Sequence, residues 1–213
     1  MTAQLYCFGE SGNAYKAALT MELAGYDWRP VYIDFFHGEA RSPQFRTLNE
    51  MGEVPVFREG DLILTQSAVI QMHVAERSGK FWGSDRNETL RWIMFDNHKL
   101  SGQAGAARFL QNFIPADKRP QGAVDYLRGR LSAAYKVLND HLAGRDWVAD
   151  NAPTITDFAC CGYLYYPEPF GFERTEWPHI DRWLDGIAAL PGWKHPYDLM
   201  PGNPSDRAAK EEA

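Results

Sequence analysis

The spacing of apolar residues changes at about Asn87, and this change limits the fold more than any other feature of the sequence. Before it, short strand-like runs (QLYCF, RPVYID, EVPVF, DLILT) are mixed with amphipathic stretches (AYKAALTMELAG, SAVIQMHVAERSG). After it, strand-like runs nearly vanish and apolar residues recur at spacings of three and four, as in ETLRWIMFDNHKLSGQAGAARFLQNFI and AVDYLRGRLSAAYKVLNDHLAG. The chain is therefore predicted to have an α/β part followed by an all-α part.

The order of elements in the first part indicates its architecture. A strand, a helix and a strand are followed by an irregular or short helical stretch, two strands and a final helix. This order predicts an α/β layer with a mixed four-stranded sheet. We expect this domain to span residues 1–79, the segment KFWGSDRN (80–87) to be a linker, and residues 88–213 to form an all-helical domain.

The composition excludes several classes of protein. The chain has 213 residues, 45% hydrophobic and 23% charged, which is typical of a soluble globular protein. Its net charge of -6, with no cluster of Lys and Arg, argues against nucleic-acid binding. Without a signal-peptide pattern at the start or an apolar run of about 18 residues, we expect a cytoplasmic protein that does not contact membranes. The three cysteines suit neither a disulfide framework nor a metal site.

The segment PTITD marks a helix start. Thr154 is expected to cap the backbone, and Asp157, three residues later, to reach back to it in a capping box. A structural role is therefore predicted for Asp157, and a catalytic one is not.

A proline interrupts one of the predicted strands, because Pro55 stands between two valines in EVPVF. Proline has no N–H for a sheet ladder and is normally kept off central strands. The residues alone favour an edge-strand proline.

Several stretches together resemble the cytosolic glutathione transferases: SGNAYKAALTMELAG, LNEMGEVPVF, LTQSAVIQMHVAE, TITDFACCGYL and WPHIDRWLDGIAALPGW. They follow the family's order and spacing over nearly the whole chain, and are similar to bacterial, serine-type (theta- or nu-like) members. The resemblance implies a thioredoxin-like fold for the first domain and a cis Val54–Pro55 bond. It also implies glutathione as co-substrate, no metal, and a homodimer in which the first domain of one subunit packs on the second domain of the other.

The resemblance further implies which residues bind the γ-glutamyl end and the peptide backbone of glutathione. Gln66 and Ser67 match the family's pair at the start of a helix, where unpaired N–H groups suit the γ-glutamyl carboxylate. Gln66 is expected to accept from the amino group of the ligand. The alternative for Ser67 is plain N-capping. The backbone of Val54, beside Pro55, is expected to pair with the extended tripeptide as an added strand.

At the glycine-end carboxylate, the chain departs from the family. Many relatives carry Lys just before the Val-Pro pair, whereas this chain has Glu53, which would repel a carboxylate. Arg41 or His37 is a candidate replacement for the missing cation, with ordinary surface charge as the alternative.

The thiol of glutathione must be held as a thiolate, against a free-cysteine pKa of about 8.5. Ser11 falls where serine-type members carry their activating hydroxyl, and Asn13 falls where some bacterial members place an amide donor. A loop or capping role is the alternative for Ser11. The register of tyrosine-type members falls on Cys7, and the cysteine of cysteine-type members is expected around Ser11, so neither mechanism is expected.

These features predict a glutathione transferase whose thiolate attacks a small hydrophobic electrophile held by the helical domain. The electrophile pocket is expected between the domains. Candidate helices there carry Arg91, Trp92, Phe95, His98, Arg108 and Phe109, and none of these is assigned to the pocket. The alternatives are a glutathione-dependent peroxidase or disulfide reductase, or a non-catalytic binding module on the same fold. Glu53 favours the last of these.

Overall fold

The computed structural model describes residues 2–204, which divide into two compact units. Among the described residues, the first unit contains residues 2–80 together with residues 191–204, and the second is Phe81–Leu190. The first unit holds strands and helices, and the second holds helices without strands among its described elements. The predicted change from α/β to all-α is confirmed.

The first unit has the predicted order of elements. It contains β1 (Ala3–Cys7), α1 (Gly12–Ala24), β2 (Trp28–Tyr32), a 3₁₀ turn (Glu39–Arg41), α2 (Pro43–Arg46), β3 (Val56–Glu59), β4 (Leu62–Thr65), α3 (Ser67–Ser78) and the short α9 (Pro196–Leu199). Gly25 and Gly79 end α1 and α3 in left-handed conformations, which glycine adopts without a Cβ penalty.

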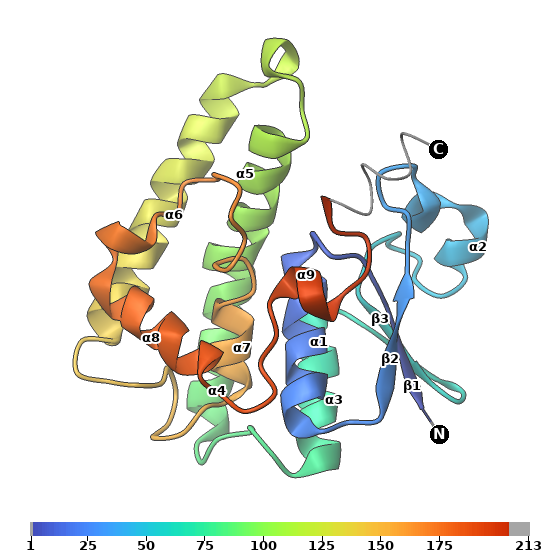
Figure 1. Cartoon of the computed structure of the whole chain (residues 1–213), viewed down its shortest axis with the longest axis horizontal. Helices are drawn as coiled ribbons and strands as arrows, with labels where there is room; N and C mark the ends of the chain where they lie inside the picture. Colours follow the sequence, from blue (N-terminus) through green and yellow to red (C-terminus); the bar gives the residue numbers. More distant parts are fainter. Residues whose placement is uncertain (1, 205–213) are drawn as a thin grey trace. The chain divides into compact units, whose positions relative to one another are not determined.

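The four strands form one mixed sheet in the order β2-β1-β3-β4. β1 is parallel to β2, whereas β3 is antiparallel to both β1 and β4. Helices α1 and α3 pack together on one face of this sheet, and α2 lies on the other (Figure 1). The α/β thioredoxin-like class with a mixed four-stranded sheet, predicted for this domain, is confirmed.

The second unit consists of helices joined by loops. They are α4 (Arg86–Phe95), a π-helical stretch (Asp96–Ser101), α5 (Gly102–Asn112), α6 (Gln121–His141), α7 (Ile155–Cys160) and α8 (Pro178–Ala188), with 3₁₀ turns at Ala116–Lys118 and Arg174–Glu176. The long apolar stretch from residue 88 to 114 was predicted to be helical. It forms α4 and α5 with the π-helical stretch between them.

The predicted capping box at the start of α7 is confirmed. The Thr154 side chain accepts from the helix backbone, and the Asp157 side chain accepts from the Thr154 N–H at 2.8 Å. Asp157 is fully buried and also accepts from the Val148 N–H and the Trp183 Nε1–H. One carboxylate thus joins the loop before α7, the start of α7 and α8.

The structure divides the chain differently from the expected boundaries at two places. Residues 191–204 were expected in the helical domain, but they pack with the first unit, where the Tyr15 hydroxyl donates to the Lys194 carbonyl at 2.9 Å. Residues 81–87 were expected to be a linker, but they belong to the helical unit. The Phe81 carbonyl accepts from the Ile155 N–H at 2.8 Å, and its ring contacts Phe158.

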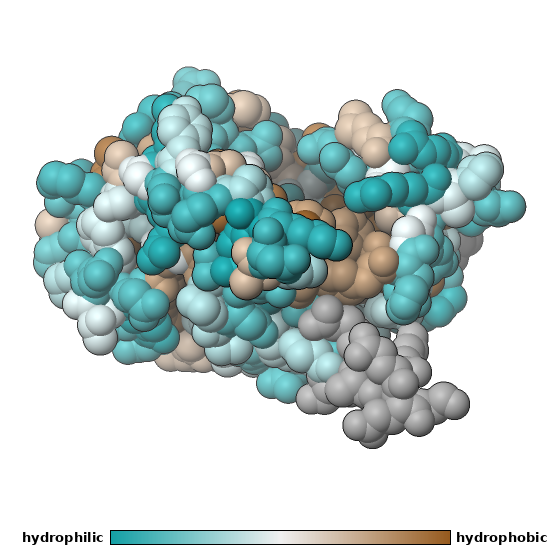
Figure 2. Space-filling view, turned by 90° about the horizontal axis from the view of Figure 1, so that it is seen from above, coloured by the Kyte–Doolittle hydropathy of each residue, from teal (hydrophilic) through white to brown (hydrophobic). Residues whose placement is uncertain are grey.

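Most charged side chains of the described residues lie on the surface, whereas Glu10, Lys16, Asp96, Arg108 and Asp157 are buried. Figure 2 shows hydrophilic side chains over most of the face that it presents, with apolar ones interspersed. Within residues 2–204, no helix combines the length and the apolar character needed to cross a bilayer.

Candidate functional site

The register of the sheet places most of the predicted glutathione-binding residues at one end of it. Tyr6 of β1 is paired with Val56 of β3, and Val56 with Thr65 of β4. The last residues of β1, the first of β3 and the last of β4 therefore lie side by side. Because β1 and β4 both run toward this end, the helices that follow them, α1 and α3, both begin there.

Ser11 is the N-cap of α1 at this end of the sheet. Its side-chain oxygen accepts from the Ala14 N–H at 3.2 Å, and its own N–H donates to the Phe8 carbonyl at 3.0 Å. A hydroxyl that accepts in a cap bond still carries its own proton. The capping alternative is therefore observed for Ser11, and it is compatible with donation of this proton to a ligand.

The other residues considered for thiol activation are Asn13, Cys7 and Tyr6. Asn13 is the second residue of α1 and is half-buried. Burial raises the pKa of the Cys7 thiol to about 12, so this side chain is a poor nucleophile. The Tyr6 ring lies edge-on to Phe45 of α2, in the apolar cluster on the α2 face of the sheet.

The Val54–Pro55 peptide bond is cis, as the resemblance implied. Pro55 lies outside the strand, one residue before β3, so the edge-strand interpretation from the residues alone is wrong. The loop before it is held by the buried Asn49, whose Nδ2 donates to the Glu53 carbonyl at 2.7 Å. The Glu53 side chain is exposed.

Gln66 and Ser67 lie at the start of α3. Gln66 has φ 66°, a value rarely adopted by residues other than glycine, and makes no side-chain cap bond. Ser67 is the first helical residue, and its side chain is buried. The N-cap of α3 is Gln66 and not Ser67, and no side chain makes a capping hydrogen bond there. Plain N-capping is therefore not the role of Ser67. The first N–H groups of α3, as at any helix start, have no acceptor within the helix.

The two cations proposed for the glycine-end carboxylate lie on the segment between β2 and α2. Arg41 ends the 3₁₀ turn before α2 and is exposed. His37 is paired with Asp34, with Nδ1 at 2.9 Å from Oδ1, and its side chain is 79% exposed. Of the two, His37 already has a carboxylate partner.

The side chains considered for the electrophile pocket divide into buried and exposed groups. Trp92 is 2% exposed, and its Nε1–H donates to Glu88 at 2.9 Å, so it belongs to the core of the helical unit. Arg108 is 1% exposed, with Nη2 at 2.7 Å from Oε2 of Glu168 and its guanidinium 4.1 Å from the centre of the Tyr166 ring. Phe95 is half-buried, and the exposed residues are Arg91, His98 and Phe109.

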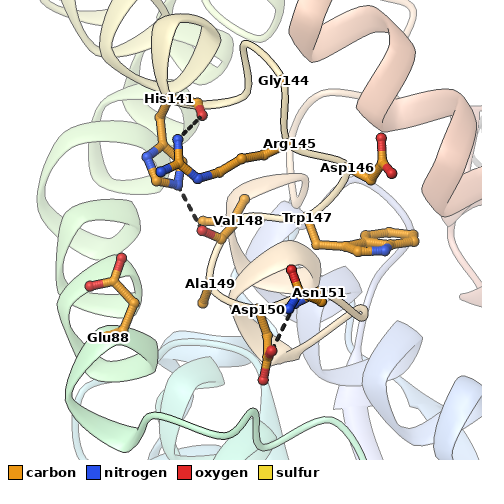
Figure 3. Close-up of a pocket in the computed structure, with 10 residues that line it drawn as sticks. All are labelled: Glu88, His141, Gly144, Arg145, Asp146, Trp147, Val148, Ala149, Asp150 and Asn151. Atoms are coloured by element: carbon orange, nitrogen blue, oxygen red, sulfur yellow. Dashed lines mark hydrogen bonds between the residues drawn. The ribbon is translucent and has the colours of Figure 1, made fainter.

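The helical unit contains a cavity of about 440 Å³ beside the loop that joins α6 to α7 (Figure 3). It is lined by Glu88, His141, Gly144, Arg145, Asp146, Trp147, Val148, Ala149, Asp150 and Asn151. Several of its polar groups already hold this loop. His141 Nε2 is 2.7 Å from the Val148 carbonyl, Arg145 Nη1 donates to the His141 carbonyl, and the Asp150 carboxylate accepts from the Ser84 and Asn151 N–H groups.

The electrostatics of this cavity agree with a structural role. The Ser84 N–H bond lowers the pKa of Asp150, the Arg91 guanidinium lowers that of Glu88, and burial lowers that of His141. These shifts favour charged carboxylates and a neutral imidazole in the bonds already made. Among the described residues, no group of three or more His, Cys, Asp or Glu side chains is placed to hold a metal ion.

Sequence reasoning missed two features beside the predicted site residues. One is Asn49, whose side chain donates to the Glu53 carbonyl in the loop before Pro55 and accepts from the Met51 N–H at 3.1 Å. The other is the contact of residues 201–203 with the turn at Gly9. The glycine in FGES was a local signal for a close backbone approach, but no pattern identifies the partner.

Comparison with known proteins places both units in families. The model described as "Glutathione S-transferase, N-terminal domain" matches residues 1–76, and "Glutathione S-transferase, C-terminal domain" matches residues 106–191.

Individual relatives match over nearly the full length. The crystal structure of a glutathione S-transferase from Xanthobacter autotrophicus Py2 is similar, with a TM-score of 0.84, 31% identity, and coverage of 97% of this chain and 100% of that one. Glutathione S-transferase 4 of Zea mays is 28% identical and covers 93% of both chains. Maleylacetoacetate isomerase of Pseudomonas aeruginosa is 25% identical, covering 97% of this chain and 99% of that protein.

Proposed function

The chain belongs to the glutathione S-transferase family, and from this premise we propose that it joins the thiolate of glutathione to small hydrophobic electrophiles. The observation that carries the proposal is the Ser11 hydroxyl, which accepts the cap bond of α1 and retains its own proton. It lies at the end of the sheet where α1, α3 and the Val54–Pro55 bond meet.

Five residues at this end of the sheet have proposed roles in binding or activating glutathione. The Ser11 hydroxyl donates to the sulfur, with Asn13 as the alternative donor, and this hydrogen bond favours the thiolate over the thiol. Ser67 and the start of α3 bind the γ-glutamyl carboxylate, and Gln66 accepts from the amino group. The backbone of Val54 pairs with the cysteinyl residue of the ligand. The thiolate itself is the nucleophile, so the reaction requires no covalent protein intermediate.

Two measurements test this proposal. The protein is expected to be retained on immobilised glutathione and to be released by free glutathione. It is also expected to accelerate the conjugation of glutathione with a generic aryl halide. If the protein is not retained on immobilised glutathione, the proposal that it is a glutathione-dependent enzyme is wrong. Retention without conjugation would favour the non-catalytic binding module, whose main support is the exposed Glu53.

Another glutathione-dependent reaction is the second candidate. Peroxidase and disulfide reductase activities use the same thiolate, and the isomerase among the relatives covers nearly the whole chain. A panel of a peroxide, a mixed disulfide and a cis enone separates these activities from conjugation. The reaction with the highest kcat/KM assigns the activity.

Glu53 gives a prediction on binding. Replacing it with lysine is expected to tighten glutathione binding about fivefold, because repulsion of the glycine-end carboxylate becomes attraction worth about 1 kcal/mol at an exposed site. Glu50→Lys is the matched control, since Glu50 is exposed three residues earlier on the same loop. Calorimetric titration measures both variants. Equal affinities for the two would show that Glu53 does not face this carboxylate.

We also propose that the protein is a homodimer in which the first unit of one subunit contacts the helical unit of the other. Each unit carries exposed apolar side chains that would be covered. On the helical unit, Met94 of α4 and Val137 of α6 are 59% and 51% exposed. Val137 also lines a cavity of about 210 Å³ with Phe95, Lys99, Arg130, Ala133 and Ala134. On the first unit, the exposed apolar residues are Met51, Leu62, Ile63 and Val69.

Sedimentation velocity tests this arrangement. The wild type is expected to sediment with twice the mass of one chain, and Val137→Glu is expected to shift it to the monomer, because an unpaired carboxylate would be desolvated in the interface. Ser132→Glu is the control, since Ser132 is exposed on another face of the same helix. A wild type with the mass of one chain would contradict the proposal.

A further inference from the structure

The stretch of residues 191–204, called here the C-terminal segment, contacts the turn that carries Ser11. The Gly9 N–H in this turn donates to the Pro201 carbonyl at 2.6 Å. A Cβ on Gly9 would lie 3.1 Å from the backbone nitrogen of Asn203, which is tighter than ordinary van der Waals contact. The two backbones therefore approach closely because residue 9 has no side chain.

A second glycine brings the same segment against β2. Gly202 has φ 80°, and a Cβ there would lie 2.2 Å from Cε2 of Tyr32. Tyr32 is the last residue of β2, which is parallel to β1, so its ring lies at the same end of the sheet as the Ser11 turn. The segment thus occupies a space between the turn after β1 and the end of β2 that glycine alone fits without displacement.

The beginning of the C-terminal segment is anchored separately to α1. The Tyr15 hydroxyl donates to the Lys194 carbonyl at 2.9 Å, and Lys194 Nζ lies 2.7 Å from Oε1 of Glu22. Between these anchors and Pro201, the segment forms α9, whose start is capped by the His195 ring. The contact at Gly9 therefore belongs to a continuous path along α1.

We infer that the C-terminal segment positions the Ser11 hydroxyl, an inference that rests on the proposed function of Ser11. Within the turn, the Ser11 N–H donates to the Phe8 carbonyl at 3.0 Å. From outside, the Pro201 carbonyl holds the Gly9 N–H. The turn is thereby held at the Gly9 N–H and at the Ser11 N–H, which are two residues apart in the chain. Pro201, Gly202 and Tyr32 are positioning residues, since they act on the sulfur through Ser11.

Gly202→Ala tests the inference because the new methyl group must displace either the segment or the Tyr32 ring. Gly25→Ala is the matched control: Gly25 has φ 71°, so the backbone strain is similar, but a Cβ there meets nothing within 4 Å. The pKa of bound glutathione is read from the ultraviolet absorption of its thiolate during a pH titration. We expect Gly202→Ala to raise this pKa by about one unit relative to Gly25→Ala, a tenfold change in the ionisation constant.

Hydrogen exchange gives a second measurement that does not depend on glutathione. The Gly9 amide is expected to exchange at least about tenfold faster in Gly202→Ala than in Gly25→Ala, because its acceptor is displaced. If Gly202→Ala does not fold, Tyr32→Ala replaces it, since it removes the ring against which Gly202 packs, and the same two changes are expected.

The outcomes separate the inference from the proposed function. If the wild type shows no thiolate signal with glutathione, the proposed function is wrong and the inference falls with it. If the wild type shows the signal but Gly202→Ala, or Tyr32→Ala in its place, matches Gly25→Ala in both measurements, the inference alone is wrong. Faster exchange at Gly9 without a pKa change would also overturn it, because the turn would then move without affecting the sulfur.

Discussion

Replacing Ser11 with alanine is expected to lower kcat/KM for conjugation about a hundredfold near neutral pH. Loss of one preorganised donor to a developing or resident anion typically costs on the order of 10²–10³ in rate. Ser11 supplies such a donor because its oxygen accepts the Ala14 N–H and its proton remains for the sulfur. Without it, the pKa of the bound thiol rises toward the free value of about 8.5.

The pH dependence distinguishes loss of this donor from a general loss of structure. A thiol with a raised pKa ionises only at higher pH, so the deficit of Ser11→Ala is expected to shrink as pH rises through about 8.5. Steady-state kinetics across this range with the aryl halide make the comparison. A deficit that stays constant with pH would contradict thiol activation by Ser11.

Two further variants complete this test. Ser11→Ala also removes an N-cap, which costs about 1 kcal/mol of stability. Asp85→Ala is the control, because Asp85 caps α4 in the helical unit through the Asn87 and Glu88 N–H groups. It is expected to lose similar stability and to keep its rate. If Asn13→Ala loses the rate while Ser11→Ala keeps it, the activating donor is Asn13.

Replacing Asp157 with alanine is expected to lower the free energy of unfolding by about 3 kcal/mol or more. The fully buried carboxylate accepts from Val148 N at 2.8 Å, Thr154 N at 2.8 Å, Thr154 Oγ1 at 3.0 Å and Trp183 Nε1 at 2.9 Å. Alanine would leave the Val148, Thr154 and Trp183 N–H groups without this acceptor in the core. Burial raises the pKa of Asp157, whereas the donated bonds oppose that shift.

Urea unfolding followed by tryptophan fluorescence measures this loss, and Trp183 is a local probe because it donates to Asp157. Asp140→Ala is the matched control. Asp140 pairs with Lys136 on the surface of α6, where both side chains are more than half exposed, so a change below about 0.5 kcal/mol is expected. A similar loss in both variants would show that the buried network does not carry the stability.

Local patterns predicted the parts of the fold that depend on neighbouring residues. Gly25 and Gly79 are the last letters of the amphipathic stretches AYKAALTMELAG and SAVIQMHVAERSG, and both end their helices, α1 and α3, in left-handed conformations. The capping box of Thr154 and Asp157 was expected from a spacing of three residues. Each of these depends on hydrogen bonds or backbone angles within one turn of chain, so the sequence contains all the participants.

Pro55 shows where the residues alone were insufficient. A proline between two valines suited an edge strand, yet β3 begins at Val56 and Pro55 precedes it with a cis bond. The isomer of a prolyl bond is selected by the fold around it, since the intrinsic preference for trans is only about 0.5–1 kcal/mol. The resemblance to a family supplied that context, and the five residues EVPVF did not.

The division into an α/β domain and an all-α domain could be predicted from this sequence, because the spacing of hydrophobic residues indicates which face of each element is buried. The contacts of residues 191–204 could not be predicted from the sequence. Gly9 contacts Pro201 and Tyr32 contacts Gly202, and both pairs are far apart in the chain. A glycine indicates that something approaches closely, but its partner is decided by how distant segments pack. Periodicity reports burial, whereas only the tertiary structure determines which buried groups meet.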